Sequence, residues 1–360
     1  MNAGEVASPQ AWATRRLAEG LVIPAHPLAL TAAGRFDERR QRALSRYYAA
    51  AGAGGLAVGV HTTQFEIRQS GIDLLAPVLR CTAETLDELE RAGGPRMVRI
   101  AGVCGGAAQA VKEAELAAGL GYHAGLLSLA ALGQAGDDEL IAHCRAVAGV
   151  MPLVGFYLQR AVGGRRLGFD FWRRFAEIPN VLAVKIAPFN RYETLEVVRG
   201  VAAAGRAGQV ALYTGNDDNI VADLVTRFDV NVGGRVISQR IVGGLLGHWA
   251  VWTLRAAELL TAARRVAAGD GQVPADMLAL GAQVTDCNAA LFDVAHDFAG
   301  CIAGVQHVLY GQGLLGSTRC LKAGEVLSAS QAGQIDRVRR EYPHLIDDAF
   351  VAEHRDEWLA

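Results

Sequence analysis

The chain has 360 residues, of which 51% are hydrophobic and 20% charged, and its formal net charge is −2. These values are typical of a globular protein with a sizeable core, and a near-neutral charge without a basic run disfavours nucleic acid as a partner. The first 20 residues contain no apolar segment of signal-peptide length, and His248, Arg255 and Glu258 interrupt the most apolar later stretch, so we expect a cytoplasmic protein without a membrane span.

Short apolar runs alternate with longer segments of helical period over the first two thirds of the chain. Residues 36–52 and 82–94 are two of these helical segments, and each ends at a glycine that can stop a helix. Apolar runs that alternate with helices are typical of a parallel sheet, and eight such units match the size of a closed (β/α)8 TIM barrel. In chain order, the predicted strands are residues 21–27, 55–61, 96–103, 125–130, 152–158, 181–187, 210–215 and 228–234.

The strand pattern stops at about residue 245. Residues 241–260 are interpreted as part of a packed helix, and residues 248–269 and 329–343 also have a helical pattern. We therefore predict an α/β protein of two regions. Residues 1–244 form the barrel with a short N-terminal lead-in, and residues 245–360 form a C-terminal helical extension packed on the barrel.

The cysteine and glycine patterns indicate no cofactor. Six cysteines lie far apart without a C-x-x-C pair, which disfavours both a disulfide framework and a zinc site. Gly102, Gly105 and Gly106 follow a predicted strand, but their spacing is not that of a dinucleotide-binding turn. We expect neither a metal nor an organic cofactor.

Lysine is rare in this chain, which obtains its positive charge from arginine. Of the three lysines, Lys112 and Lys322 lie in polar segments, whereas Lys185 lies inside a predicted barrel strand. A buried amine lowers its pKa, and a neutral amine is the nucleophile that converts a ketone into an imine. The alternative is that Lys185 reaches solvent at the end of the strand or pairs with a carboxylate.

Candidate site residues lie at or just after the ends of three other predicted strands, at the expected barrel mouth, where active sites of this fold lie. Tyr157 is a candidate proton carrier, although a core tyrosine with a satisfied hydroxyl is the alternative. Thr62 and Thr63 can hold a carboxylate and relay a proton, or form an ordinary turn. Gly215 permits close approach of a substrate, and Asp217 contacts a substrate hydroxyl or caps the next helix.

Six segments that include these residues resemble segments of the dihydrodipicolinate synthase / N-acetylneuraminate lyase family of class I aldolases. They occur along this chain in the same order as in that family. Tyr157 lies 28 residues before Lys185, as is usual for that family's tyrosine and lysine. The segments are residues 20–27 with 34–37, residues 51–56 with Thr62 and Thr63, residues 152–157 with Gly164, Val184 with Lys185, residues 214–217, and residues 234–238.

The resemblance implies Lys185 as the imine-forming lysine, Tyr157 as general acid/base, and Thr62 and Thr63 as carboxylate and relay positions. It also implies a homo-oligomer, a dimer or a tetramer. Ile237 lies in the last matching segment and is expected to contact substrate. The other expected substrate contacts are Arg160, Gly215 and Asp217.

The sequence departs from the family pattern at several of these segments. Gln64 and Phe65 replace the Gly-Glu that follows the two threonines, and Val162 stands where the family has an arginine for the substrate carboxylate. Arg160 and Arg165 lie close enough to take the place of that arginine. The tyrosine expected after the fourth strand is missing from residues 125–136. These changes indicate a second substrate other than aspartate semialdehyde.

Three hypotheses follow for the function. The first is a lyase that makes or breaks a carbon–carbon bond while pyruvate or a related 2-oxo acid is held on Lys185. The second is dehydration of a sugar-derived 2-oxo acid through the same imine. The third is a barrel that has lost catalysis and serves in binding or regulation.

Overall fold

The computed structural model describes residues 8–269 and 271–360, and its centre is a barrel of eight parallel strands. The strand order is β1-β9-β7-β6-β5-β4-β3-β2. A parallel bridge between Ala25, which follows β1, and Ala57 of β2 brings the two ends of this order together. The strands are β1 (Val22–Pro24), β2 (Gly55–Val58), β3 (Val98–Val103), β4 (Ala124–Leu127), β5 (Leu153–Leu158), β6 (Val181–Ala187), β7 (Ala211–Thr214) and the last part of β9 (Arg235–Leu246).

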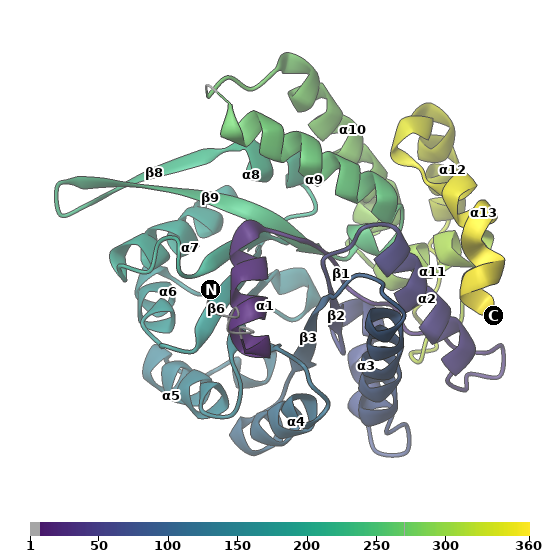
Figure 1. Ribbon diagram of the computed structural model, residues 1–360, viewed down its shortest axis with the longest axis horizontal. Helices are drawn as coiled ribbons and strands as arrows, with labels where there is room; N and C mark the ends of the chain where they lie inside the picture. Colours follow the sequence, from purple (N-terminus) through teal and green to yellow (C-terminus); the bar gives the residue numbers. More distant parts are fainter. Residues whose placement is uncertain (1–7, 270) are drawn as a thin grey trace, which may run out of the picture.

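Helices follow the strands along the chain and surround the barrel (Figure 1). The predicted (β/α)8 TIM barrel is thereby confirmed, because the strands are parallel and each apolar run is buried between helices and the barrel interior. The surrounding helices are α2 (Glu38–Ala50), α3 (Leu75–Arg91), α4 (Ala107–Gly119), α5 (Asp137–Ala148), α6 (Phe169–Ala176), α7 (Arg191–Ala203) and α8 (Ile220–Val225).

Two hydrophobic clusters distinguish the two faces of the barrel strands. The inner cluster fills the barrel and includes Phe156 and Ala183, together with Ala13 and Leu17 of helix α1 (Pro9–Glu19). Tyr213 also lies inside the barrel, and its hydroxyl donates to the Leu17 carbonyl at 2.7 Å. Helix α1 is thereby tied to the interior and closes the N-terminal end of the barrel. The outer cluster lies between strands and helices, so membership of one cluster or the other shows which way a strand residue points.

The eighth strand differs from the prediction. Residues 228–234 belong to a hairpin in which β8 (Arg227–Val232) pairs antiparallel with the first part of β9. Gly233 and Gly234 form its turn with φ of 59° and 84°, which is the signature of a two-residue hairpin. The eighth barrel strand is residues 241–246, which pair with β7 and β1. A short apolar run of this kind fits a buried strand and a buried helix equally well, so the helical interpretation of residues 241–260 was wrong at its start.

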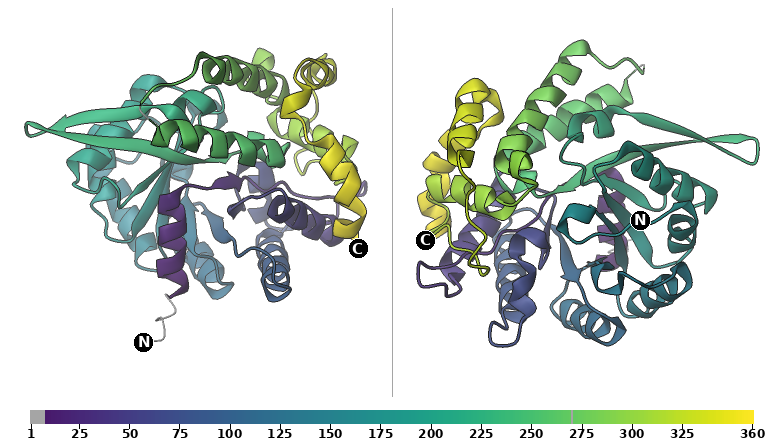
Figure 2. Two further views of the ribbon diagram at one scale, coloured as in Figure 1. Left: turned by 45° about the horizontal axis from the view of Figure 1, so that its top comes forward. Right: turned by 180° about the vertical axis from the view of Figure 1, so that it is seen from behind.

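The hairpin of β8 and β9 projects from the barrel as an arm in all three views (Figures 1 and 2). Within the part of the chain that the structure describes, β8 pairs with β9 alone. Val236, on this arm, is 65% exposed. An apolar side chain on a free sheet edge is a feature of surfaces that pair with another chain.

Among the described residues of the C-terminal region, five α-helices follow the barrel and gather at one side of it (Figure 2). A short helical turn, η5 (His248–Ala250), connects the last barrel strand to them. The helices are α9 (Thr253–Ala268), α10 (Ala275–Leu291), α11 (Cys301–Gly311), α12 (Gln331–Glu341) and α13 (Asp348–Leu359). None of the helices described for this chain has both the length and the apolar character of a membrane span.

Candidate active site

Lys185 points into the barrel near the C-terminal end of β6. Its strand neighbours Val184 and Ile186 belong to the outer cluster, whereas Ala183 and Ala187 belong to the inner one, so the alternation of the strand places Lys185 inside. The side chain is only 7% exposed, and its Nζ lies 4.5 Å from the centroid of the Phe156 ring. The amine therefore lies at the mouth of the barrel in largely apolar surroundings.

Gly215 makes room for this lysine. A Cβ at residue 215 would lie 2.7 Å from Cε of Lys185 and 2.8 Å from Cβ of Ala187, closer than side chains tolerate. Gly215 follows β7, and its N–H donates to the Ile186 carbonyl at 2.7 Å. Gly215 therefore lets the lysine side chain pass close to the backbone, and the approach of a substrate to Gly215 stays a prediction.

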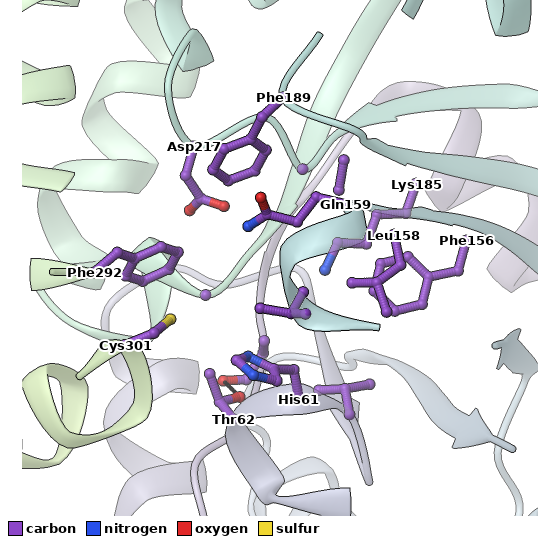
Figure 3. Close-up of a pocket in the computed structure, with 16 residues that line it drawn as sticks. His61, Thr62, Phe156, Leu158, Gln159, Lys185, Phe189, Asp217, Phe292 and Cys301 are labelled. Atoms are coloured by element: carbon purple, nitrogen blue, oxygen red, sulfur yellow. Dashed lines mark hydrogen bonds between the residues drawn. The ribbon is translucent and has the colours of Figure 1, made fainter. Parts of the chain in front are cut away.

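A pocket of about 490 Å³, part of it open to solvent, surrounds the end of Lys185 (Figure 3). Loops after several barrel strands line it, and the C-terminal region supplies Phe292 and Cys301. The polar lining residues besides Lys185 are His61, Thr62, Gln159, Asp217 and Cys301. The remaining lining residues are Ala25, Val60, Phe156, Leu158, Val162, Ala187, Phe189, Gly215, Gly247 and Phe292.

Asp217 presents a carboxylate to the same pocket (Figure 3). Its side chain is 5% exposed, and Oδ1 accepts a hydrogen bond of 3.1 Å from the backbone N–H of His248 in η5. The C-terminal region thus orients this carboxylate as well as lining the pocket. Asp217 does not act as a helix cap, because α8 begins at Ile220 and its N-cap residue is Asn219.

A second buried carboxylate, Asp223 of α8, holds the turn that carries Gly215 and Asp217. It accepts hydrogen bonds from the Thr214 hydroxyl at 2.7 Å and from the Asn216 amide at 3.0 Å, and it forms an ion pair with Arg191. Asn216 Oδ1 in turn accepts from the backbone N–H of Phe189 at 3.0 Å. Buried polar networks of this kind stiffen a loop, so the turn is held in one geometry.

Burial governs the ionisation of the polar groups in the pocket. It lowers the pKa of Lys185 to about 8, although the nearby Asp217 opposes the shift. Burial also raises the pKa of Asp217 to about 7, and Lys185 opposes that shift. Burial, aided by the charge of Lys185, lowers the pKa of His61 to about 4, so its imidazole is neutral near neutral pH. Burial therefore moves the pKa values of this amine and this carboxyl group toward each other.

Tyr157 does not line the pocket, although its place near the end of a predicted strand and the family resemblance pointed there. Its ring belongs to the outer cluster and packs against Trp172 of α6 with a centroid distance of 5.2 Å, and its hydroxyl accepts from the Leu167 N–H at 3.2 Å. Phe156 faces Lys185 instead, because the two are register partners in β5 and β6. The register of these strands shifts by one residue between Leu153 and Val154, and a one-residue shift reverses the side on which a residue lies.

The other predicted contacts divide between the pocket and other parts of the structure. Thr62 lines the pocket, and its hydroxyl donates to the Ala25 carbonyl at 2.7 Å. Thr63 is fully buried outside the lining: its hydroxyl donates to the His26 carbonyl at 2.6 Å and accepts from the Gly59 and Val60 N–H groups. The Thr63 hydroxyl thus ties the end of β2 to the chain after β1, and it has no hydrogen bond to Tyr157 among those of the described residues.

Arg160 and Ile237 also lie outside the pocket. The Arg160 side chain is 65% exposed and pairs with Glu193 at 3.2 Å. Ile237 lies in the projecting arm, where its register partner is Val230, and it does not line the pocket. Arg165 donates to the carbonyls of Leu132 and Ala135 rather than to the pocket.

Most of the lining residues were not predicted as site residues, among them Phe156, Gln159, Phe292 and Cys301. Gln159 follows β5 directly, so its position after a barrel strand was a usable signal. Phe292 and Cys301 come from the helical extension, where no strand end marks them. Burial raises the pKa of the Cys301 thiol well above its ordinary value. Among residues 8–269 and 271–360, no cluster of three potential ligands is arranged to hold a metal ion.

Fold and pocket together define a (β/α)8 barrel with a buried lysine at its mouth. No model of a known protein family matches the sequence, and no curated protein matches it. Solved structures of the dihydrodipicolinate synthase and N-acetylneuraminate lyase family have the same fold. The dihydrodipicolinate synthase from Acinetobacter baumannii, complexed with pyruvate, matches with a TM-score of 0.71 and 18% identity over 90% of this chain and 99% of that one.

Two further structures show the same likeness. CdNal from Clostridium difficile, complexed with mannosamine, matches with a TM-score of 0.70 and 14% identity over 90% of this chain and 99% of that one. A prophage protein of the dihydrodipicolinic acid synthase family from E. coli K12, complexed with pyruvate, matches with a TM-score of 0.69 and 16% identity over 90% and 97%. This chain thus has the barrel fold of that family at low sequence identity.

Proposed function

We propose that this protein is a divergent member of that family, and a lyase that holds pyruvate or a related 2-oxo acid as an imine on Lys185. The observation that carries the proposal is the buried amine at the barrel mouth, whose pKa is lowered by its apolar surroundings. A neutral amine is required for attack on the ketone carbon, and the loss of water from the adduct yields the imine. Two of the similar barrels were solved with pyruvate bound.

The protonated imine withdraws electrons from the neighbouring carbon of the substrate. Removal of a proton from C3 gives an enamine, which forms a carbon–carbon bond with an aldehyde, and the reverse sequence breaks that bond. Each step needs a group that takes up or delivers a proton near the imine. The Tyr157 side chain faces away from the barrel interior, and the Phe156 ring has no group that takes up or releases a proton. Another group must therefore transfer the protons.

Asp217 is the proton carrier in this proposal. Its carboxylate points into the pocket that contains the lysine, and the His248 N–H holds it in place. Efficient proton transfer near neutral pH needs a pKa near 7, which burial gives to Asp217 and not to His61. Gln159, whose amide points into the pocket, is proposed to donate to the substrate carboxylate in place of an arginine (Figure 3).

Exchange of the methyl hydrogens of pyruvate in D₂O tests this function without knowledge of the second substrate. The enamine forms and reverts when Lys185 and Asp217 act together. We therefore expect the protein to accelerate incorporation of deuterium into the methyl group of pyruvate, as measured by proton NMR. A protein that leaves the exchange rate of pyruvate and of larger 2-oxo acids at the background level would instead be a binding or regulatory barrel.

The variant Tyr157→Phe separates the two candidates for the proton carrier. Because the Tyr157 hydroxyl lies between β5 and α6, we expect the exchange rate to stay within about threefold of the parent value. The loss of its hydrogen bond should lower the free energy of unfolding by about 1 kcal/mol, measured by urea denaturation. A hundredfold loss of exchange in a folded Y157F protein would show that Tyr157 enters the site.

We also propose a cytoplasmic homo-oligomer, a dimer or a tetramer, that does not bind nucleic acid. The projecting hairpin of β8 and β9, with its free edge and the exposed Val236, is the surface that we expect another copy to cover. Light scattering coupled to gel filtration should therefore give a mass that is a multiple of 38.1 kDa. A monomer at all concentrations would contradict this assembly.

A further inference from the structure

Three phenylalanines surround the space next to Lys185. Phe156 lies under the amine on β5, Phe189 follows β6, and Phe292 follows α10 of the C-terminal region (Figure 3). Leu158 and Val162 add further apolar surface. The barrel and the helical extension thus both contribute apolar walls to one pocket.

Phe189 is held in the pocket by a strained backbone. Its φ of 54° lies in the left-handed region, which a bulky residue rarely adopts, and Asn216 Oδ1 accepts its N–H. Phe298, with φ of 67°, meets the Phe189 ring edge-on at a centroid distance of 5.8 Å. Strained residues of this kind are concentrated at ligand sites, where the surrounding structure holds them in place.

The polar groups of the pocket are few and are already used by the proposed reaction. Lys185 holds the 2-oxo acid, Asp217 carries protons, and Gln159 meets the carboxylate. Among the described residues that line the pocket, none is an arginine, and His61 and Thr62 are the main polar groups left. The hydroxyl groups of a sugar-like aldehyde would lose their hydrogen bonds to water in the pocket and find few new partners there. We therefore expect such a pocket to disfavour a sugar-like aldehyde.

We infer that the second substrate is an aldehyde with an apolar, ring-sized group, such as an aromatic aldehyde. This inference rests on the proposed function. The enamine carbon, C3 of pyruvate, forms a bond with the aldehyde carbon while the C=O π bond breaks and Asp217 protonates the oxygen. Water then hydrolyses the imine, which releases a 4-aryl-4-hydroxy-2-oxobutanoate and the free amine of Lys185.

The test compares benzaldehyde with glyceraldehyde as partners for pyruvate, with products quantified by mass spectrometry and pyruvate exchange measured in parallel. We expect kcat/KM for benzaldehyde to exceed that for glyceraldehyde by at least ~10-fold, the ratio that burial of one ring can provide. Phe292→Ala and the milder Phe292→Leu should lower kcat/KM for benzaldehyde by roughly 10-fold or less, and by a larger factor than they lower the rate of pyruvate exchange.

Phe350→Ala is the matched control. Phe350 lies in α13 against Tyr47 and Trp358, away from the pocket, so this variant should leave both activities unchanged. Pyruvate exchange without a preference for benzaldehyde, or a preference that both Phe292 variants retain in full, would overturn the inference and leave the proposed function intact. Absence of pyruvate exchange would overturn the proposed function, and this inference with it.

Discussion

Replacement of Lys185 by arginine is expected to lower both pyruvate exchange and aldol turnover by at least ~10³-fold. Arginine retains its proton and cannot form an imine, so no other group takes over the chemistry. Replacement by methionine should have the same effect on activity. Both rates are measured by NMR and by product formation at saturating pyruvate.

Stability measurements distinguish a chemical role of Lys185 from a structural one. Because the folded pKa is lowered, the charged amine is less stable in the folded protein than in the unfolded chain, and this cost is present at pH values below about 8. Lys185→Met should therefore keep or raise the melting temperature at pH 6.5 while it abolishes activity. Lys112→Arg, on the exposed side of α4, is the control and should leave activity within twofold. Retention of more than a tenth of the exchange rate in Lys185→Met would contradict the proposal.

Asp217→Asn is expected to cause the second large loss, about 10²- to 10⁴-fold in pyruvate exchange and in turnover, which is the usual contribution of a general acid/base. Asparagine keeps the shape of the side chain and can still accept the His248 N–H, so the fold should persist. Asp218→Asn is the matched control. Asp218 is exposed and does not line the pocket, and its replacement should change the rates only a few-fold.

The pH profile of Asp217→Asn gives a signature that a merely structural role would not produce. The negative charge of Asp217 raises the pKa of Lys185, and its removal should lower that pKa further below about 8. Imine formation requires the neutral amine, so its rate rises with pH through this pKa. The pH range over which this rate rises is measured by borohydride trapping at a series of pH values. It should shift to lower pH in the variant. An unchanged range would show that the two groups do not interact.

Most of the barrel was predictable because its strands are short apolar runs between helices. Seven of the eight strands lie where the alternation of the sequence places them, including residues 181–187 around the lysine. The eighth barrel strand was predicted too early in the chain, because Gly233 and Gly234 turn the chain back into a hairpin at the predicted position. The apolar run after the hairpin, which forms the barrel strand, resembles a helix. Local periodicity does not reveal which of two adjacent β segments joins the barrel.

The site was predictable where it depends on a single strand and not where it depends on register. Lys185, Gly215, Asp217 and Thr62 all line the pocket or shape it, as expected from strand ends. Tyr157 was misplaced because the register shift at Leu153 and Val154 places Phe156 opposite Lys185. The register between two strands depends on how both strands pack, so the spacing of two residues along the chain does not reveal which residues lie opposite each other.

The contribution of the C-terminal region could not be predicted for a different reason. Phe292, Cys301 and the His248 N–H reach the pocket only through the packing of helices that are distant in sequence from Lys185. No local motif marks them, although Phe292 adds to the apolar walls of the site and the His248 N–H orients Asp217. The helical extension is therefore part of the site and not merely an addition to the barrel.

Borohydride reduction in the presence of pyruvate tests the central claim most directly. Reduction fixes the imine as a stable adduct on the amine, and mass spectrometry of peptides locates it. The chain has only three lysines, so Lys112 and Lys322 act as internal controls. We expect one adduct per chain, on Lys185 alone and dependent on pyruvate or a related 2-oxo acid. A chain that stays unmodified with every such acid, or that is labelled equally at the two exposed lysines, would contradict an imine-forming role for Lys185.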